Sequence, residues 1–136
     1  MSKNYSFLVE ELSVNPSAIQ SKKEQTSKKI QYVTSYVEKW LYVMTERSTT
    51  TDIVFIDAMS NSGIYSDGDL GTAPKVCRMF SRFSKRHPKL KFHMYINDAN
   101  EERMKSCGAI CRHFSPYKQR IVIRASHLDV NDYLNF

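Results

Sequence analysis

Residues 52–63 read DIVFIDAMSNSG, an unbroken apolar run between two aspartates that leads into small and polar residues. An apolar run such as Ile53 to Ile56 is typical of a parallel β-strand that is buried on both faces. The residues that follow, as far as Gly71, include three of the four glycines, which predicts a long loop rather than a tight turn. The stretch therefore predicts a buried strand that delivers a polar loop to the edge of a sheet.

An amphipathic helix is expected before this strand. Apolar residues recur at three- and four-residue steps from Ile30 to Met44, and the pattern begins near Lys23. A second helix is expected after the loop, because Pro74 suits a first helical turn and Pro88 a helix stop. Both helices would cover the strand with an apolar face.

The rest of the chain continues the alternation. Residues 90–96 alternate apolar and polar side chains as a strand does. Asp98 and Glu101 resemble a capping box at the start of a third helix, and residues 121–123 form a third apolar run. Strands that alternate with helices require right-handed crossovers and a parallel sheet.

The predicted fold class is α/β, as a three-layer Rossmann-like half-sheet of parallel strands in the order 3-2-1 with an N-terminal amphipathic helix. Residues 1–22 are expected to form an arm, and residues 23–136 a truncated Rossmann-like domain. At 136 residues the chain suits one domain.

Composition limits the location and the partners. The net charge of +6 favours encounters with phosphates or acidic surfaces. Three cysteines without paired spacing disfavour a disulfide framework, and no apolar stretch is long enough for a signal sequence or a membrane span. We therefore expect a cytoplasmic protein.

Polar residues gather where the predicted strands end. In an open parallel sheet, ligands bind beyond the carboxyl ends of the strands. The candidate binding residues at these ends are Asp57, Ser60, Asn61, Gly63, Asp98 and Asp129. The alternative is that these acids only cap helices and strands. Neither Gly-x-Gly-x-x-Gly nor a Gly-Lys-Ser/Thr phosphate loop is present, which disfavours dinucleotide and triphosphate sites.

Four spaced segments carry a family resemblance. They are KIQYVTSYVEKW, FIDAMSNSGIYSDGDLGTAP, YINDANEERM and SHLDVNDYL, between Lys29 and Leu134. Together they resemble the N-terminal half of the three-Cys-motif partner proteins, which are methyltransferase-like. The resemblance implies the first half of a class I methyltransferase and an S-adenosylmethionine pocket. It places Asp57 and Gly63 at the methionine end of that pocket, Asp98 at the ribose and Asp129 near the adenine.

Two departures from the family pattern bear on activity. Ser60 and Asn61 stand where the family usually has an Ala-Gly pair, so we expect crowding and weakened cofactor binding. The sequence stops at Phe136, before the fourth strand whose end carries the catalytic motif in methyltransferases. We therefore expect a domain or fragment that is inactive by itself, and no catalytic residue is predicted.

The same stop leaves the first strand at an edge. In the methyltransferase arrangement this strand lies beside the fourth, so Ile53 to Ile56 would be unpaired, and such edges attract other chains. We expect either a homo-oligomer paired along this strand or a missing C-terminal half that completes the sheet.

A basic run suggests a further partner. Nucleic acid is a candidate partner for Arg78, Arg82, Lys85, Arg86 and Lys89. The alternative is that these cations complement a helix dipole and keep the surface soluble. Cys107 and Cys111 fall on an apolar helical stripe, so we expect them in the core and predict no metal. A non-enzymatic basic module for self-association or nucleic-acid binding is the alternative function.

Overall fold

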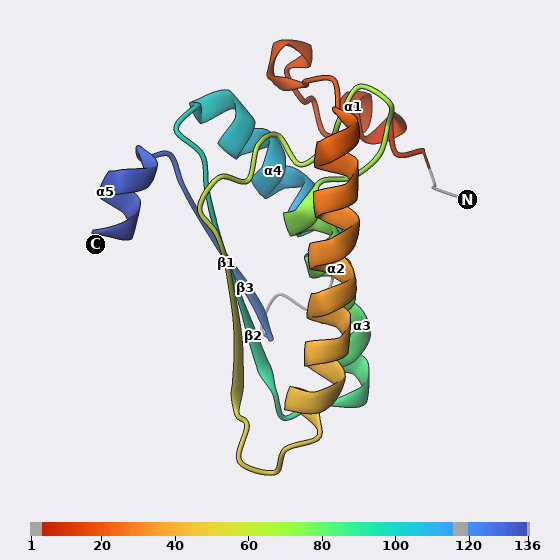
Figure 1. The fold of residues 1–136 in the computed structure, drawn as a ribbon, viewed down its shortest axis with the longest axis vertical. Helices are drawn as coiled ribbons and strands as arrows, with labels where there is room; N and C mark the ends of the chain where they lie inside the picture. Colours follow the sequence, from red (N-terminus) through yellow and green to blue (C-terminus); the bar gives the residue numbers. More distant parts are fainter. Residues whose placement is uncertain (1–3, 116–119, 136) are drawn as a thin grey trace.

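The computed structural model describes residues 4–115 and 120–135. Figure 1 shows a short parallel sheet flanked by helices. The elements are α1 (Phe7–Glu11), the 3-10 turn η1 (Pro16–Ala18), α2 (Glu24–Thr45), β1 (Asp52–Asp57), α3 (Thr72–Arg86), β2 (Lys91–Asn97), α4 (Glu101–His113), β3 (Ile121–Ser126) and α5 (Val130–Leu134).

The sheet confirms the predicted α/β class and the parallel strands. Its order is β1-β2-β3, so β2 is central, and both neighbours run parallel to it. In the register, Phe92 of β2 pairs with Ile53 on one side and Ile121 on the other. The three carboxyl ends therefore meet at one edge of the sheet, where ligands bind in such folds.

Helices α2, α3 and α4 form one layer on one side of the sheet (Figure 1). Within this layer α4 packs on β3 and β2, α3 packs on β2, and α2 packs on α3. The core between layer and sheet is apolar and includes Leu41, Ile53, Phe80, Phe92 and Met94. Helix α2 therefore lies at the β1 side of the layer.

The opposite face of the sheet is open, so the expectation that β1 is buried on both faces is wrong. Val54 and Ile56 are 47% and 58% exposed, whereas Ile53 on the helix side is 1% exposed. Of the expected third layer, only α5 lies on this side in the described residues (Figure 1). A continuous apolar run has no alternation, so it could not distinguish this half-covered strand from a fully buried one.

The N-terminal arm is fastened to the long loop after β1. Gln20 forms a parallel bridge with Tyr65, and the amide of Tyr5 donates to the carbonyl of Gly68 at 2.7 Å. A second apolar cluster joins Tyr5 and Leu8 of the arm to Ile64 of the loop and Ile110 of α4. The loop is therefore held from outside by the arm and from inside by α4.

The start of α4 differs from the predicted capping box. Its N-cap is Asn100, whose side chain accepts a hydrogen bond from the amide of Arg103 at 3.0 Å. Asp98 instead lies two residues before this N-cap and accepts a hydrogen bond from the amide of Asn100. In the described ranges, none of the helices combines the length and apolar character needed to cross a bilayer.

Candidate functional site

Asn97 is the central polar residue where the carboxyl ends of the strands meet. It is fully buried, and its amide nitrogen donates to the carbonyls of Ala58 at 3.0 Å and Leu128 at 2.9 Å. Its amide oxygen accepts from the hydroxyl of Ser126 at 2.8 Å and the amide of Leu128 at 2.9 Å. One side chain thus uses its full hydrogen-bonding capacity to join the end of β2 to the segments at the ends of β1 and β3.

Asp98, the candidate ribose ligand, is engaged with the protein itself. Its two carboxylate oxygens each accept a backbone amide, from Asn61 and from Asn100, both at 2.9 Å. The residue is 8% exposed. Its position at the end of β2 is the predicted one, and its carboxylate joins the loop after β1 to the start of α4.

Asp57 lies at the end of β1, close enough to Asp98 for the two charges to repel each other. Burial raises the pKa of Asp57, and the neighbouring Asp98 raises it further, against a weak hydrogen bond from the amide of Met59. The shared edge therefore brings these two candidate acids together, and their mutual repulsion adds to the raised pKa of Asp57.

The glycine-bearing loop turns inward. Gly63 has a φ of +82°, and a Cβ added there would lie 3.1 Å from both the Cα of Cys107 and the ring of Pro74. Ser60 is buried, and Asn61 takes a left-handed conformation with a φ of 57°. The lack of a side chain at Gly63 is thus explained by close packing against Cys107 and Pro74.

Asp129 follows Leu128, whose backbone bonds to the side chain of Asn97. Its carboxylate accepts from the amide of Asn131 at 2.9 Å and caps the short helix α5. The residue is exposed, and its carboxylate acts as the N-cap of α5. No contact in the structure joins it to Asp57 or Asp98 among the described residues.

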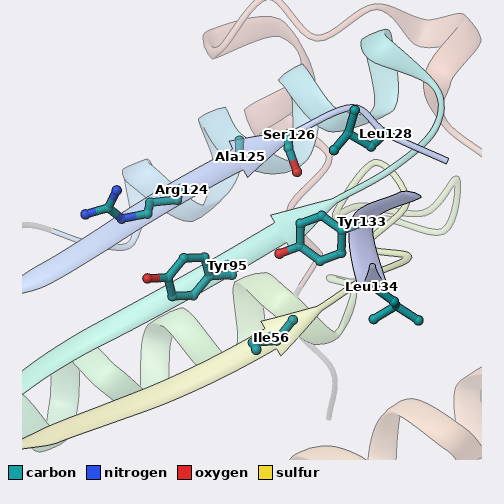
Figure 2. A pocket seen from close by; sticks show the side chains of 8 residues that line it. All are labelled: Ile56, Tyr95, Arg124, Ala125, Ser126, Leu128, Tyr133 and Leu134. Carbon is teal, nitrogen blue, oxygen red and sulfur yellow. The ribbon is translucent and has the colours of Figure 1, made fainter. Parts of the chain in front are cut away.

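A hollow lies between α5 and the open face of the sheet, at the carboxyl ends of the strands (Figure 2). Its volume is about 440 Å³, in the range of small-molecule sites. It is lined by Ile56, Tyr95, Arg124, Ala125, Ser126, Leu128, Tyr133 and Leu134. The lining is mostly apolar, with the rings of Tyr95 and Tyr133 near one another in Figure 2 and the guanidinium of Arg124 at one end.

The electrostatics connect this hollow to the acids at the strand ends. Burial raises the pKa of Tyr133, and Tyr95 and Asp57 add to the shift. Arg124 lies over the ring of Tyr95 at 6.0 Å from its centroid. A ligand in the hollow would therefore meet two aromatic rings and a cation.

Comparison with protein-family models, curated proteins and solved structures found no match. The three-Cys-motif partner resemblance therefore stays a prediction that rests on the quoted segments alone.

The candidate nucleic-acid residues lie on the other side of the molecule, on and after α3. Arg78, Arg82 and Lys85 line a shallow hollow of about 230 Å³ together with Ser81 and Phe114. Arg82 also forms an ion pair with Glu38 at 2.9 Å. Arg86 lies over the rings of Tyr42 and Phe83, and Lys89 follows the helix in an exposed position.

Phe83 and Tyr95 are aromatic residues near this run in the sequence that could stack on nucleic-acid bases. Phe83 is 1% exposed and is therefore closed to a base. Tyr95 lies on the open sheet face, away from α3 (Figure 2). The basic run therefore offers cations and the edge of Phe114, without an exposed stacking platform built from those two rings.

Sequence reasoning missed Tyr95, Tyr133 and the bonding of Asn97 as site features. In the alternating sequence of β2, Tyr95 lies between the apolar residues Met94 and Ile96, so its side chain must point to the other face of the sheet. This pattern could have placed Tyr95 on the open face. The contribution of Tyr133 depends on how α5 turns back over the sheet, and no local pattern reports this. Cys77, Cys107 and Cys111 are fully buried in the core, as their apolar stripes predicted.

Proposed function

We propose that the chain is a methyltransferase-like half-domain that binds the adenosine part of an S-adenosylmethionine-type cofactor without catalysing transfer alone. One observation carries the proposal, namely the hollow at the carboxyl ends of three parallel strands. Parallel α/β sheets bind nucleotides at this edge. The quoted family segments support the same ligand class.

The residues of the hollow fit an adenosine better than those of the β1 loop do. Tyr95 and Tyr133 offer aromatic surface to a planar base, and the hydroxyl of Ser126 offers a polar partner. Arg124 would attract the carboxylate of a methionine group. When bound, the cofactor supplies an activated methyl group; the chain's own residues bind and orient it.

Calorimetric titration with S-adenosylmethionine and S-adenosylhomocysteine tests the proposal. Tyr95→Leu and Tyr133→Leu should each weaken binding by about tenfold, because loss of an aromatic contact costs about 1–1.5 kcal/mol. Phe7→Leu is the matched control, since Phe7 is an exposed aromatic residue of the arm. Absence of binding heat for both ligands would overturn the proposal.

Asp98→Asn separates the hollow from the pocket implied by the family. Asp98 is occupied by two backbone amides, so its replacement should change the affinity less than replacement of either tyrosine. A larger loss for Asp98→Asn would place the ribose at Asp98 instead. Folding of each variant is checked by circular dichroism.

Binding of a polyanion along α3 is the second candidate function. The specific observation is that Arg78, Arg82 and Lys85 converge on one hollow, while the whole chain carries +6. A phosphate would have to displace Glu38 from Arg82. Such binding would explain why the basic residues lie on one helix.

Fluorescence anisotropy with a labelled single-stranded RNA, repeated at several salt concentrations, tests this second candidate. Arg82→Gln and Lys85→Gln should each weaken binding and lower the salt slope by about one. Lys105→Gln is the control, because Lys105 is an exposed cation of α4. Equal effects of all three variants, or no binding at low salt, would remove the polyanion candidate.

A further inference from the structure

We propose that two copies of this chain join along the free edges of β1, antiparallel and centred on Val54, so that their sheets become continuous. Their α2 helices then pack together above the junction. The free edge of β1 is a different surface from the cofactor hollow and from the basic face of α3, and pairing along it depends on neither.

The first observation is the unpaired edge of β1. This strand pairs with β2 on one side, and within residues 4–115 and 120–135 no strand pairs with its other side. Its central residues are apolar on both faces, and Val54 and Ile56 are exposed. An apolar edge of this kind presents unpaired amides and carbonyls to any strand that fits it.

The second observation is an apolar flank of α2. Glu38 bonds to Arg82 and Tyr42 packs on Phe83, so that side of α2 faces α3. Val37 and Leu41 face the core. The flank opposite α3 carries the exposed side chains of Tyr32, Tyr36 and Val43. Together with Trp40, which is partly buried against the core, they form the α2 flank.

The α2 flank lies on the same side of the molecule as the free edge. Helix α2 is at the β1 side of the helix layer, and Figure 1 shows α2 and β1 on the near side of the molecule. Tyr32 and Tyr36 are 75% and 63% exposed. Exposed tyrosine and tryptophan side chains are enriched at protein interfaces, so an added strand and an added helix would find complementary surface together.

The charges of DIVFID select a second copy in the antiparallel direction. A parallel, in-register copy would place Asp52 against Asp52 and Asp57 against Asp57, which is unfavourable. Antiparallel pairing about Val54 separates these like charges. It places Ile53 opposite Phe55 of the other copy on the helix side, and Val54 opposite its own counterpart on the open face.

The alternative antiparallel register is less favourable. Centring the pair on Phe55 would place Ile53 opposite Asp57 on the helix side, where a carboxylate would face apolar side chains. Centring on Val54 leaves Asp57 opposite Thr51 and puts Asp52 opposite Ile56 on the open, solvated face. A two-fold axis through Val54 thus gives an isologous interface, the kind most common in homodimers.

The effect of salt distinguishes dimerisation from binding of a polyanion. Each copy carries +6, so two copies repel each other at long range. Added salt should therefore strengthen the dimer, whereas it would weaken binding of a polyanion. Sedimentation velocity over a range of protein and salt concentrations measures the dissociation constant, and a monomer at every concentration up to the millimolar range would overturn the proposal.

A matched pair of variants tests the edge. Val54, His93 and Val122 form one row across the open face, so Val54 and Val122 occupy equivalent positions on opposite edge strands. Val54→Lys places two ammonium groups together and should raise the dimer dissociation constant by at least about tenfold. Val122→Lys adds the same charge at the other edge and should leave it nearly unchanged; equal effects would exclude pairing through β1.

A cross-link tests the register. The native cysteines are buried, so a cysteine introduced on the open face is the reactive one. Directly opposed residues of antiparallel strands have Cβ atoms about 4.5–5.5 Å apart, so Val54→Cys should form a disulfide-linked dimer under mild oxidation. Val122→Cys should not. A cross-link in both variants, or in neither, would overturn the proposal.

Discussion

Asn97 and Leu128 exchange two hydrogen bonds, since the side-chain amide donates to the carbonyl of Leu128 and accepts from its backbone amide, both at 2.9 Å. Beyond the end of β3, the side chain thereby makes the pair of hydrogen bonds to one residue that a neighbouring strand would otherwise make. Because the same amide also holds Ala58, the segments after β1 and β3 depend on one residue of β2.

Replacement of Asn97 by Ala should lower the free energy of unfolding by about 2–4 kcal/mol, because several buried groups lose their partners at once. Urea denaturation monitored by circular dichroism measures the change. Asn135→Ala is the control, since Asn135 is exposed near the end of the chain. A loss below about 0.5 kcal/mol for Asn97→Ala would show that water replaces these bonds.

Replacement of Gly63 by Ala should destabilise the protein by about 3 kcal/mol, from a strained left-handed backbone and from overlap with Cys107 and Pro74. The contrast is Gly108→Ala in α4. There a Cβ meets mainly the flexible end of Arg112, and helix propensity favours alanine by about 1 kcal/mol. Thermal unfolding of both variants checks the opposite signs.

Replacement of Asp57 by Asn should stabilise the protein at pH 7. Burial and Asp98 raise the pKa of Asp57 in the folded state above its ordinary value of 3.8. The stability that protonation of Asp57 contributes is therefore fully present below pH 3.8, and it is lost as the pH rises through the pKa of the folded state. The asparagine side chain removes that loss. The gain should be present at pH 7 and should vanish below pH 3.8, where the carboxyl group is protonated in both states.

Urea denaturation of wild type and Asp57→Asn at pH 7 and at pH 3.5 measures this difference. The asparagine can still accept the hydrogen bond from Met59. If Asp57→Asn is less stable than wild type at pH 7, the prediction is wrong, because the folded protein would then stabilise the charged carboxylate of Asp57.

Replacement of Lys22 by Met should loosen the arm from the loop. The Lys22 side chain is 9% exposed and pairs with Asp69 at 2.6 Å and Asp67 at 3.2 Å. Burial opposes its charge, but these two hydrogen bonds raise its pKa overall. We expect a loss of about 1–2 kcal/mol and faster proteolytic cleavage of the arm, because Asp69 then keeps the more distant Lys75 at 3.4 Å as its cation and loses its link to the arm.

Lys28→Met is the matched control for this prediction. Lys28 also pairs with an acid, Glu24, but both side chains are largely exposed, and such pairs contribute little. Equal cleavage rates in the two variants would contradict a role for Lys22 in holding the arm.

Periodicity was sufficient to predict the strands, the order of the elements and the parallel sheet. The apolar steps of α2 and the alternation of β2 each depend on local burial, which the sequence records directly. The third strand was predicted too short, as residues 121–123, because Arg124 and Ser126 lie on the open face and interrupt the apolar run.

The candidate site was predictable in position but not in detail. The ends of parallel strands had to converge, so Asp57 and Asp98 were found near each other. The hydrogen bond from Asn61 to Asp98 depends on the left-handed backbone of Asn61. The need for glycine at position 63 depends on the close approach of Cys107. Both are tertiary features that leave no local pattern in the sequence. Three-layer burial was assumed for β1, and its apolar run could not reveal an open face.

The bridge between Gln20 and Tyr65 has a consequence for the order of synthesis. A ribosome releases the arm before the segment that receives it. Until the residues around Gly68 have emerged, Tyr5 and Leu8 have no apolar surface to occupy. If translation stalls upstream of this segment, the polypeptide should therefore be aggregation-prone and sensitive to proteases. If it stalls after α4, the arm should already be packed in its native position.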